Sequence, residues 1–151
     1  MNTKTNYVLV ALSDSISSRG VIDYLISQPL RPPDVTIVLL HIFRKSSASK
    51  DLMGKKFTQL QPARMSDFLK EAKEKLVENN YNPDRIEIEF VDKEYPAVSD
   101  GIIDEFKKRK YVMVVLGRKR MSKAEEFVLG DVSVKLVRAL ENTAVLVVKS
   151  I

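Results

Sequence analysis

The residues between Val112 and Ser133 offer the clearest chemistry in this sequence. An apolar run, VMVVL, ends at Gly117, a basic segment follows, and a second glycine, Gly130, precedes a helical pattern. A glycine at the end of a strand and another at the start of a helix bring main-chain N–H groups and a helix N-terminus close to a bound anion. The spacing therefore predicts an anion-binding loop.

Few other residues offer catalytic chemistry. The 151-residue chain has no cysteine, which excludes disulfides and thiolate chemistry and makes a reducing cytoplasm the expected location. Its single histidine, His41, has no Cys, Asp or Glu cluster at the spacing of a metal site, so we expect a packed or hydrogen-bonded structural residue. No nucleophile–base pair is visible, and we favour a binding protein over an enzyme.

The net charge of +5 permits attraction to polyanions. The densest basic clusters are residues 107–110 and 118–120, which flank one apolar strand. Acidic residues are mixed among the bases, so nucleic acid is a minority interpretation, and we expect 107–110 to be a solvated helix end. No apolar segment approaches the roughly 18 residues that cross a bilayer, and the N-terminus lacks a cleavage pattern, so no membrane partner is expected.

Apolar runs and helical periodicities alternate along the chain. Buried strands are predicted at 7–12, 35–43, 111–116 and 143–149, and an edge strand with one wet face at 85–91. Helices are predicted at 17–28, 62–79, 96–106 and 129–140, and a mobile surface loop at 44–61. The alternation predicts one α/β domain, residues 1–151, with a single open five-stranded parallel sheet and helices on both faces.

From Tyr7 to Lys149 the chain resembles the universal stress protein family. The family's ILVAVDGS corresponds to residues 8–15 and its LTLLHV to 37–42, while 117–130 and AVLVV at 144–148 follow its G-x-x-G, nine residues, G-[ST] and PVLVV pattern. The resemblance implies a fold like the adenine nucleotide alpha hydrolases, with strand order 3-2-1-4-5 and nucleotide at the carboxyl ends of the first and fourth strands. It also implies a homodimer through the C-terminal strand Val145–Lys149.

The resemblance places a candidate nucleotide site at Ser13, Asp14, Gly117, Arg118, Arg120, Gly130, Asp131, Val132 and Ser133. In ATP-binding members, the first two of these are Asp and Gly, the second loop glycine stands at Arg120, and a Ser or Thr stands at Asp131. Arg120 would reshape the loop or pair with a phosphate. A carboxylate about 4 Å from a phosphate costs on the order of 4 kcal/mol at an effective dielectric of ~20. Asp131 instead suits a helix N-cap or, with Asp14, a magnesium ion.

These features lead to three hypotheses. The first is a cytoplasmic universal-stress-like protein that acts as a homodimeric binding and stress-response module, with ATP binding weak or lost. The second is an ATP-binding universal stress protein in which Arg118, Lys119 and Arg120 contact the phosphates and slow hydrolysis occurs. The third is a polyanion- or RNA-binding module that uses the clusters 107–110 and 118–120. The sequence names neither the stress nor the partner protein.

Overall fold

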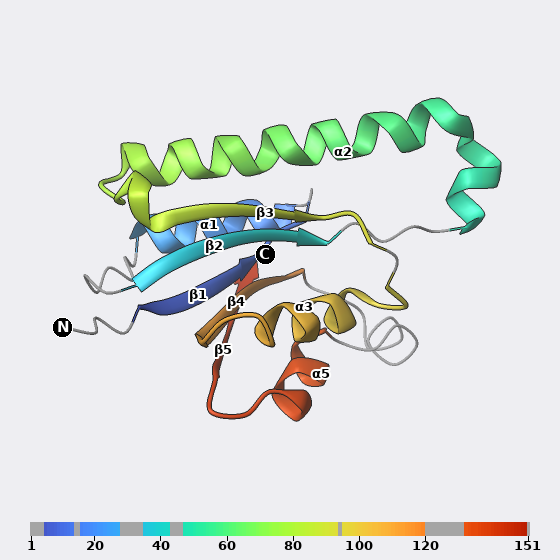
Figure 1. The fold of residues 1–151 in the computed structure, drawn as a ribbon. Helices are drawn as coiled ribbons and strands as arrows, with labels where there is room; N and C mark the ends of the chain where they lie inside the picture. Colours follow the sequence, from blue (N-terminus) through green and yellow to red (C-terminus); the bar gives the residue numbers. More distant parts are fainter. Residues whose placement is uncertain are drawn as a thin grey trace.

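The computed structural model describes residues 5–13, 16–27, 35–42, 47–93, 95–119 and 132–150 (Figure 1). Five strands form one sheet in the order β3-β2-β1-β4-β5, which confirms the predicted order. The strands are β1 (Asn6–Ala11), β2 (Val35–Ile42), β3 (Ile86–Val91), β4 (Tyr111–Lys119) and β5 (Ala144–Ser150). Every pairing between neighbouring strands is parallel, so β3 and β5 are the two edges of the sheet.

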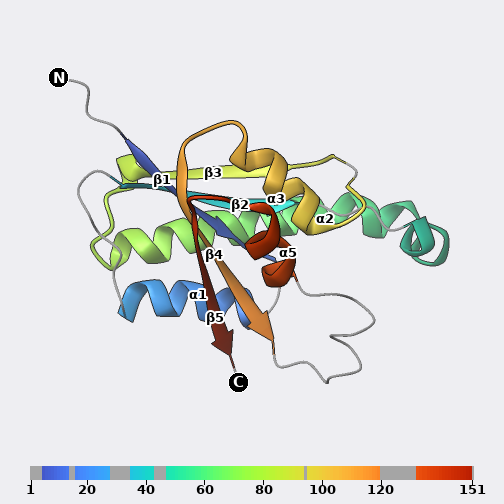
Figure 2. The same cartoon turned by 90° about the horizontal axis from the view of Figure 1, so that it is seen from below.

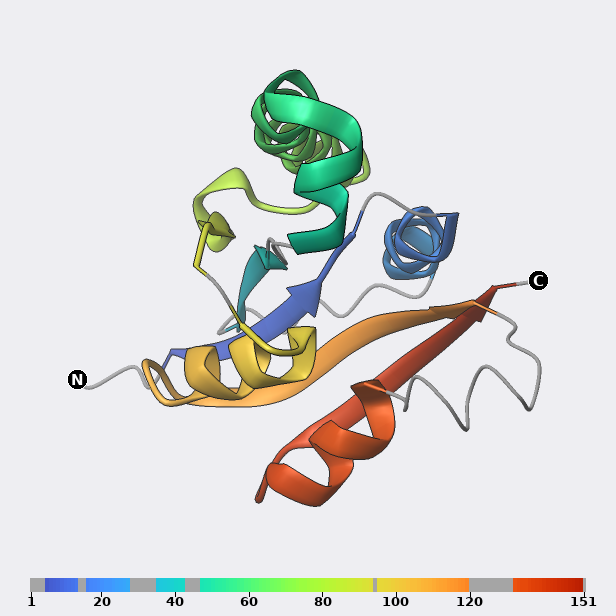
Figure 3. The same cartoon turned by 90° about the vertical axis from the view of Figure 1, so that its right-hand side faces the viewer.

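Helices cover both faces of this sheet (Figure 3). α1 (Ile16–Ser27) and α2 (Ser47–Glu78) pack on one face, and α3 (Val98–Phe106) and α5 (Val132–Ala139) pack on the other. A short 3-10 helix, η1 (Pro83–Arg85), leads into β3. Among the described helices, none combines the length and the apolar character that a bilayer crossing needs.

Successive residues of the central strands point to opposite faces and build a core on each. Val10 of β1 packs with Leu69 of α2 on one face. Its neighbour Leu9 packs with Ile102 of α3 and Leu136 of α5 on the other, and all five side chains are fully buried. Strands that are buried on both faces need continuous apolar runs, which is why the sequence predicts these strands well.

The predicted surface loop at 44–61 is wrong for most of its length. α2 begins at Ser47, so Pro62 lies inside this helix instead of opening it. The apolar face after the proline is confirmed, because Met65 and Leu69 are buried. The part of the helix that precedes Pro62 extends past the sheet in Figure 1, and its apolar residues are scattered in the sequence. Hydrophobic periodicity therefore gives no signal for this part, although most of its residue types are compatible with a helix.

β4 is also longer than predicted at its carboxyl end, while β5 is shifted by one residue toward the carboxyl end of the chain. β4 continues through Gly117 to Lys119, where Gly117 pairs with Val148 and Arg118 pairs with Lys149. The last residue of β4 that pairs with β1 is Leu116, so the extension is a two-stranded ribbon, which Figure 2 shows. The expectation that Gly117 ends the strand is wrong. Main-chain pairing with β5 continues beyond the last apolar residue of β4, Leu116.

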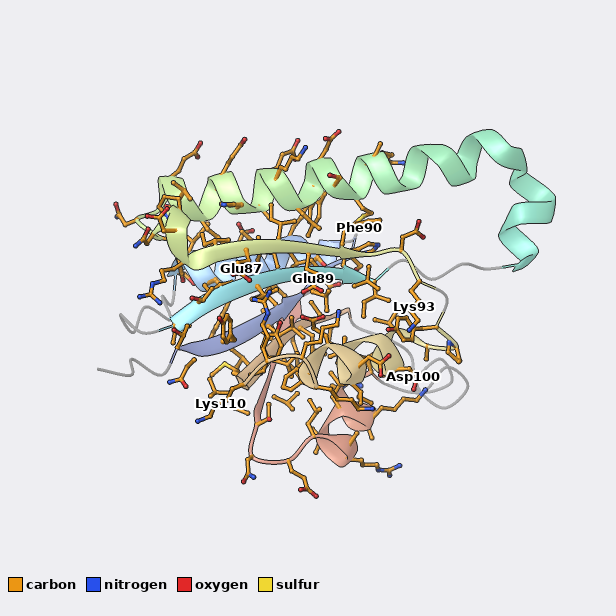
Figure 4. The ribbon with its side chains drawn as sticks, viewed as in Figure 1. Glu87, Glu89, Phe90, Lys93, Asp100 and Lys110 are labelled. Carbon is orange, nitrogen blue, oxygen red and sulfur yellow. The ribbon has the colours of Figure 1, made fainter. Side chains whose placement is uncertain are left out.

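A buried carboxylate connects α3 to the strands. Glu105 is 1% exposed, and it accepts a hydrogen bond of 2.7 Å from the hydroxyl of Tyr111 at the start of β4. The Nζ atom of Lys108 lies 3.1 Å from Oε2 of Glu105 and 3.2 Å from Oε1 of Glu89. Glu89 belongs to the edge strand β3, two residues after Glu87 (Figure 4). The contact of Lys108 with Glu89 therefore joins the end of α3 to this strand.

The two carboxyl groups influence each other's protonation. Burial raises the pKa of Glu89, and the neighbouring Glu105 raises it further, against the opposing effect of Lys108. Burial by itself would raise the pKa of Glu105 as well, but the interactions with Glu89, Tyr111 and Lys108 outweigh it and hold this pKa below its usual value. Glu89 is therefore the partner that keeps a proton to higher pH.

Glu89→Gln should make folding stability less sensitive to rising pH. The folded-state pKa of Glu89 is raised above its usual 4.5, so its contribution to stability is fully present below about pH 4.5 and is lost as the pH rises through the folded pKa. Glutamine never ionises, and the variant should lose less stability than wild type over this interval. Urea unfolding followed by circular dichroism between pH 4.5 and 8 measures the difference. Parallel stability curves for the two proteins would contradict the assignment.

Candidate functional site

A cavity of about 220 Å³ lies at the carboxyl ends of β1, β2 and β4. The described residues that line it are 11–13, 40–42 and 116–117, with Ser18, Val98, Ile102 and Val132. Here the strand order reverses direction between β1 and β4, which is where open α/β sheets bind ligands. The volume is below the roughly 300–1,000 Å³ of ordinary small-molecule sites. The cavity suits a single ring system better than a complete nucleotide.

Ser13 follows β1 and makes its contacts with α1. Its main-chain N–H donates a hydrogen bond of 2.7 Å to Oγ of Ser18, and the two hydroxyl oxygens are 3.2 Å apart. Ser18 is buried in the first turn of α1. The main-chain N–H group that a ligand anion would meet at this turn therefore already has an acceptor.

His41 holds the end of β1 from the side of β2. Its Nδ1 atom lies 2.8 Å from the carbonyl oxygen of Leu12, and because a carbonyl only accepts, Nδ1 is the donor. The N–H group of Leu12 donates in turn to the carbonyl of Leu40 at 2.8 Å. The imidazole ring also lies beside Phe90, with 5.5 Å between the ring centroids. The prediction of a hydrogen-bonded structural histidine is confirmed, and the residue lines the cavity as well.

Gly117 lies where the first turn of α1 crosses β4. A Cβ atom at this position would stand 2.5 Å from the carbonyl oxygen of Ser17 and 2.8 Å from its carbonyl carbon. Both are main-chain atoms, so neither can rotate away. The close packing of α1 on β4 therefore requires glycine here, independently of any ligand.

The cavity brings together Ser13, Gly117 and Val132 from the predicted site. Arg118 continues β4, and Ser133 is buried in α5, but neither is among the described lining residues. The remaining predicted residues lie outside the described part of the chain; they are Asp14, Arg120, Gly130 and Asp131.

Sequence reasoning did not assign the other described lining residues to the site, and three of these come from helices: Ser18, Val98 and Ile102. Ser18 is five positions from its partner Ser13, and a Ser–Ser pair across a turn matches no motif. Val98 and Ile102 belong to the apolar face of α3, which the sequence assigns to the core without showing that it also closes a cavity. The serine-rich segment SDSISS, residues 13–18, is the only signal in the sequence for the contact between Ser13 and Ser18.

Among the described residues that line the cavity, His41 is the one ionisable side chain. The basic cluster 107–110 lies at the opposite end of β4, before Tyr111. Lys107, Lys108 and Arg109 each lie within ion-pair distance of an acidic residue. These ion pairs favour the interpretation of this cluster as a helix end over that of a polyanion patch.

Comparisons with known proteins agree with the fold. The model of the universal stress protein family matches residues 5–149. A universal stress protein solved in complex with cAMP is 17% identical, with 94% of this chain and 95% of that chain covered and a TM-score of 0.64. The universal stress protein of Lactobacillus plantarum is 12% identical over 97% and 99% of the two chains, with a TM-score of 0.67. The Archaeoglobus fulgidus protein in complex with dAMP is 14% identical over 97% and 99%, with a TM-score of 0.63. No curated protein sequence matches significantly.

Gly117→Ala should destabilise the fold by about 1–3 kcal/mol, because the added methyl group forces α1 away from β4. Gly101→Ala is the matched control. The added Cβ there would meet Cδ1 of Ile42 at 2.4 Å, Cγ2 of Ile42 at 3.0 Å and the ring of Tyr95 at 3.1 Å. All three are side-chain atoms, which can shift more easily than the main chain of α1, so a smaller loss is expected. Urea unfolding of both variants measures the difference. Equal stability of Gly117→Ala and wild type would show that the close contact with Ser17 is not required.

Proposed function

The chain belongs to the universal stress protein family, and from this premise we propose that it is a homodimeric binding module of the stress response in which ATP binding is weak or lost. The observation that carries the proposal is the small cavity at the carboxyl ends of β1 and β4. Such a cavity is a place for a ligand, but the described residues around it offer little to a triphosphate.

Two features of the described lining disfavour a highly charged ligand. No lysine, arginine or carboxylate side chain belongs to it, so neither phosphates nor a bridging metal ion gain a charged partner from these residues. The N–H group of Ser13 already donates to Ser18, so it is not available to a phosphate oxygen without breaking that hydrogen bond.

The residue types in the rest of the predicted site support the same conclusion. Ser13 and Asp131 stand where the resemblance implies an Asp and a Ser or Thr in ATP-binding members. The first change removes a group that holds the nucleotide. The second brings a negative charge toward the phosphates, at a cost on the order of 4 kcal/mol for a separation of about 4 Å at an effective dielectric of ~20. That cost alone weakens a micromolar site to a millimolar one.

The alternative is a nucleotide-binding protein with an altered phosphate loop. It is supported by the two solved relatives that were determined with cAMP and dAMP, which carry fewer charges than ATP. In this alternative, a base enters the cavity between β1 and β4. The phosphate is contacted by Arg118, Lys119 and Arg120. No catalytic role is assigned to any residue in either version.

Isothermal titration with ATP and Mg²⁺ tests the proposal, with AMP and cAMP titrated in parallel. We expect an ATP dissociation constant weaker than about 10 μM, which corresponds to less than roughly 7 kcal/mol of binding free energy. The double variant Ser13→Asp with Asp131→Ser restores both family residues, and it should bind ATP at least tenfold more tightly than wild type. A wild-type constant of about 10 μM or tighter would support the nucleotide-binding alternative instead.

The proposed homodimer forms through the edge strand β5. β5 pairs with β4 on one side, and no described strand pairs with its other side, although its residues Val145 to Val148 are aliphatic. Such an edge favours pairing with another chain. Light scattering after size exclusion at micromolar concentration should give twice the mass of 17.2 kDa. A monomer mass would exclude the dimer.

A further inference from the structure

We propose that the dimer has a second contact surface, in which the outer flank of α5, formed by Val134 and Val137, packs against the same flank of a second copy of this chain. This inference rests on the proposed pairing through β5 and adds an interface that strand pairing alone does not include. Val134 is 45% exposed and Val137 is 62% exposed. They are the two most exposed large apolar side chains in the described part of the chain.

The orientation of α5 follows from the residues on its other flank. Val132 lines the cavity together with Val98 and Ile102 of α3. Seven residues later, Ala139 lines a second, open cavity of about 330 Å³ together with residues that include Phe106 of α3. One flank of α5 therefore faces α3 along its whole length.

Val134 and Val137 lie on the opposite flank. Val134 follows Val132 by two positions, and Val137 precedes Ala139 by two positions. Two positions correspond to about 200° around the axis of an α-helix, so each valine lies roughly 160° from a residue that faces α3. The two valines are one turn apart and form a short apolar stripe that points away from α3.

The side away from α3 is the side of the free sheet edge. α5 packs on β5 and next to α3, and β5 is the outermost strand (Figure 3). A partner that pairs with the outer edge of β5 would therefore lie next to the stripe of Val134 and Val137. In this proposal, the apolar edge strand and the apolar stripe of the helix both face the same partner.

The proposed pairing through β5 makes a second copy of the chain the occupant of this surface. If β5 pairs with its own copy in an antiparallel arrangement, the two sheets become continuous across a two-fold axis perpendicular to them. The α3–α5 layers of both copies then lie on the same face, with the two α5 helices adjacent across the axis and antiparallel. Each stripe meets its own copy, which is the self-complementary contact that a two-fold dimer requires.

The size of the strand edge also calls for a second surface. Stable interfaces bury roughly 1,200–2,000 Å² in total, with about 20–30 residues from each partner. β5 has seven residues, and one of its sides pairs with β4 while no described strand pairs with the other. Apolar side chains next to the strand are needed to reach an ordinary interface, and Val134 and Val137 are in that position.

Val137→Glu tests this contact by placing two like charges next to the two-fold axis. The side chain is largely exposed in the single chain, so the variant should fold normally, which circular dichroism and thermal unfolding check. Sedimentation equilibrium should show at least a tenfold weaker dimer than wild type. Ile88→Glu is the matched control, because Ile88 is an exposed apolar residue (38%) on the opposite edge strand β3, and its dimer should equal that of wild type.

A cysteine experiment locates the contact directly, because the natural chain contains no cysteine. Val134→Cys and Val137→Cys each introduce a single thiol, and at least one should form a disulfide-linked dimer under mild oxidation at low micromolar concentration, while Ile88→Cys should not. If wild type is a dimer that Val137→Glu leaves unchanged and neither cysteine links, the α5 contact is wrong while β5 pairing stands. If wild type is a monomer, the proposed dimer fails and the α5 contact fails with it.

Discussion

The position of the carboxyl end of β1 determines the shape of the site. Main-chain and side-chain hydrogen bonds fix this end on both sides, because Leu12 exchanges bonds with Leu40 and His41 of β2 while the N–H of Ser13 donates to Ser18 of α1. The absence of a side chain at Gly117 lets the same turn of α1 pack directly on β4. The cavity lies between these contacts, so the main-chain groups of Leu12 and the N–H of Ser13 already have partners before any ligand enters.

The sheet could be predicted from sequence because its strands are buried on both faces. Residues such as Leu9 and Val10 are fully buried on opposite faces of β1, so neither position tolerates a polar residue and the strand appears as a continuous apolar run. The edge strand β3 was recognisable for the opposite reason, because Glu87 and Glu89 alternate with apolar residues. Strand order came from the family resemblance, since a local pattern does not show which strands are neighbours.

The features that sequence reasoning missed depend on main-chain contacts or on residues far apart in the chain. The first part of α2 carries only scattered apolar residues in the sequence, so no periodic apolar face predicts a helix there. The extension of β4 past Gly117 is held by main-chain pairing with β5. Lys108 was predicted in a solvated helix end, but its contact with Glu89 depends on how α3 packs against β3. At the candidate site, sequence identified Ser13 and Gly117, while the tertiary fold supplied Ser18 and His41.

The central claim is that the cavity belongs to a binding module whose affinity for ATP has become weak. Amide chemical shifts of ¹⁵N-labelled protein, recorded during titration with ATP and Mg²⁺, test it at the residues concerned. The account predicts no saturable shift of the Ser13 and Gly117 amides at nucleotide concentrations up to about 10 μM, because the Ser13 amide keeps its hydrogen bond to Ser18. Saturable shifts at both amides in that range would contradict the account and show that the cavity is a nucleotide site.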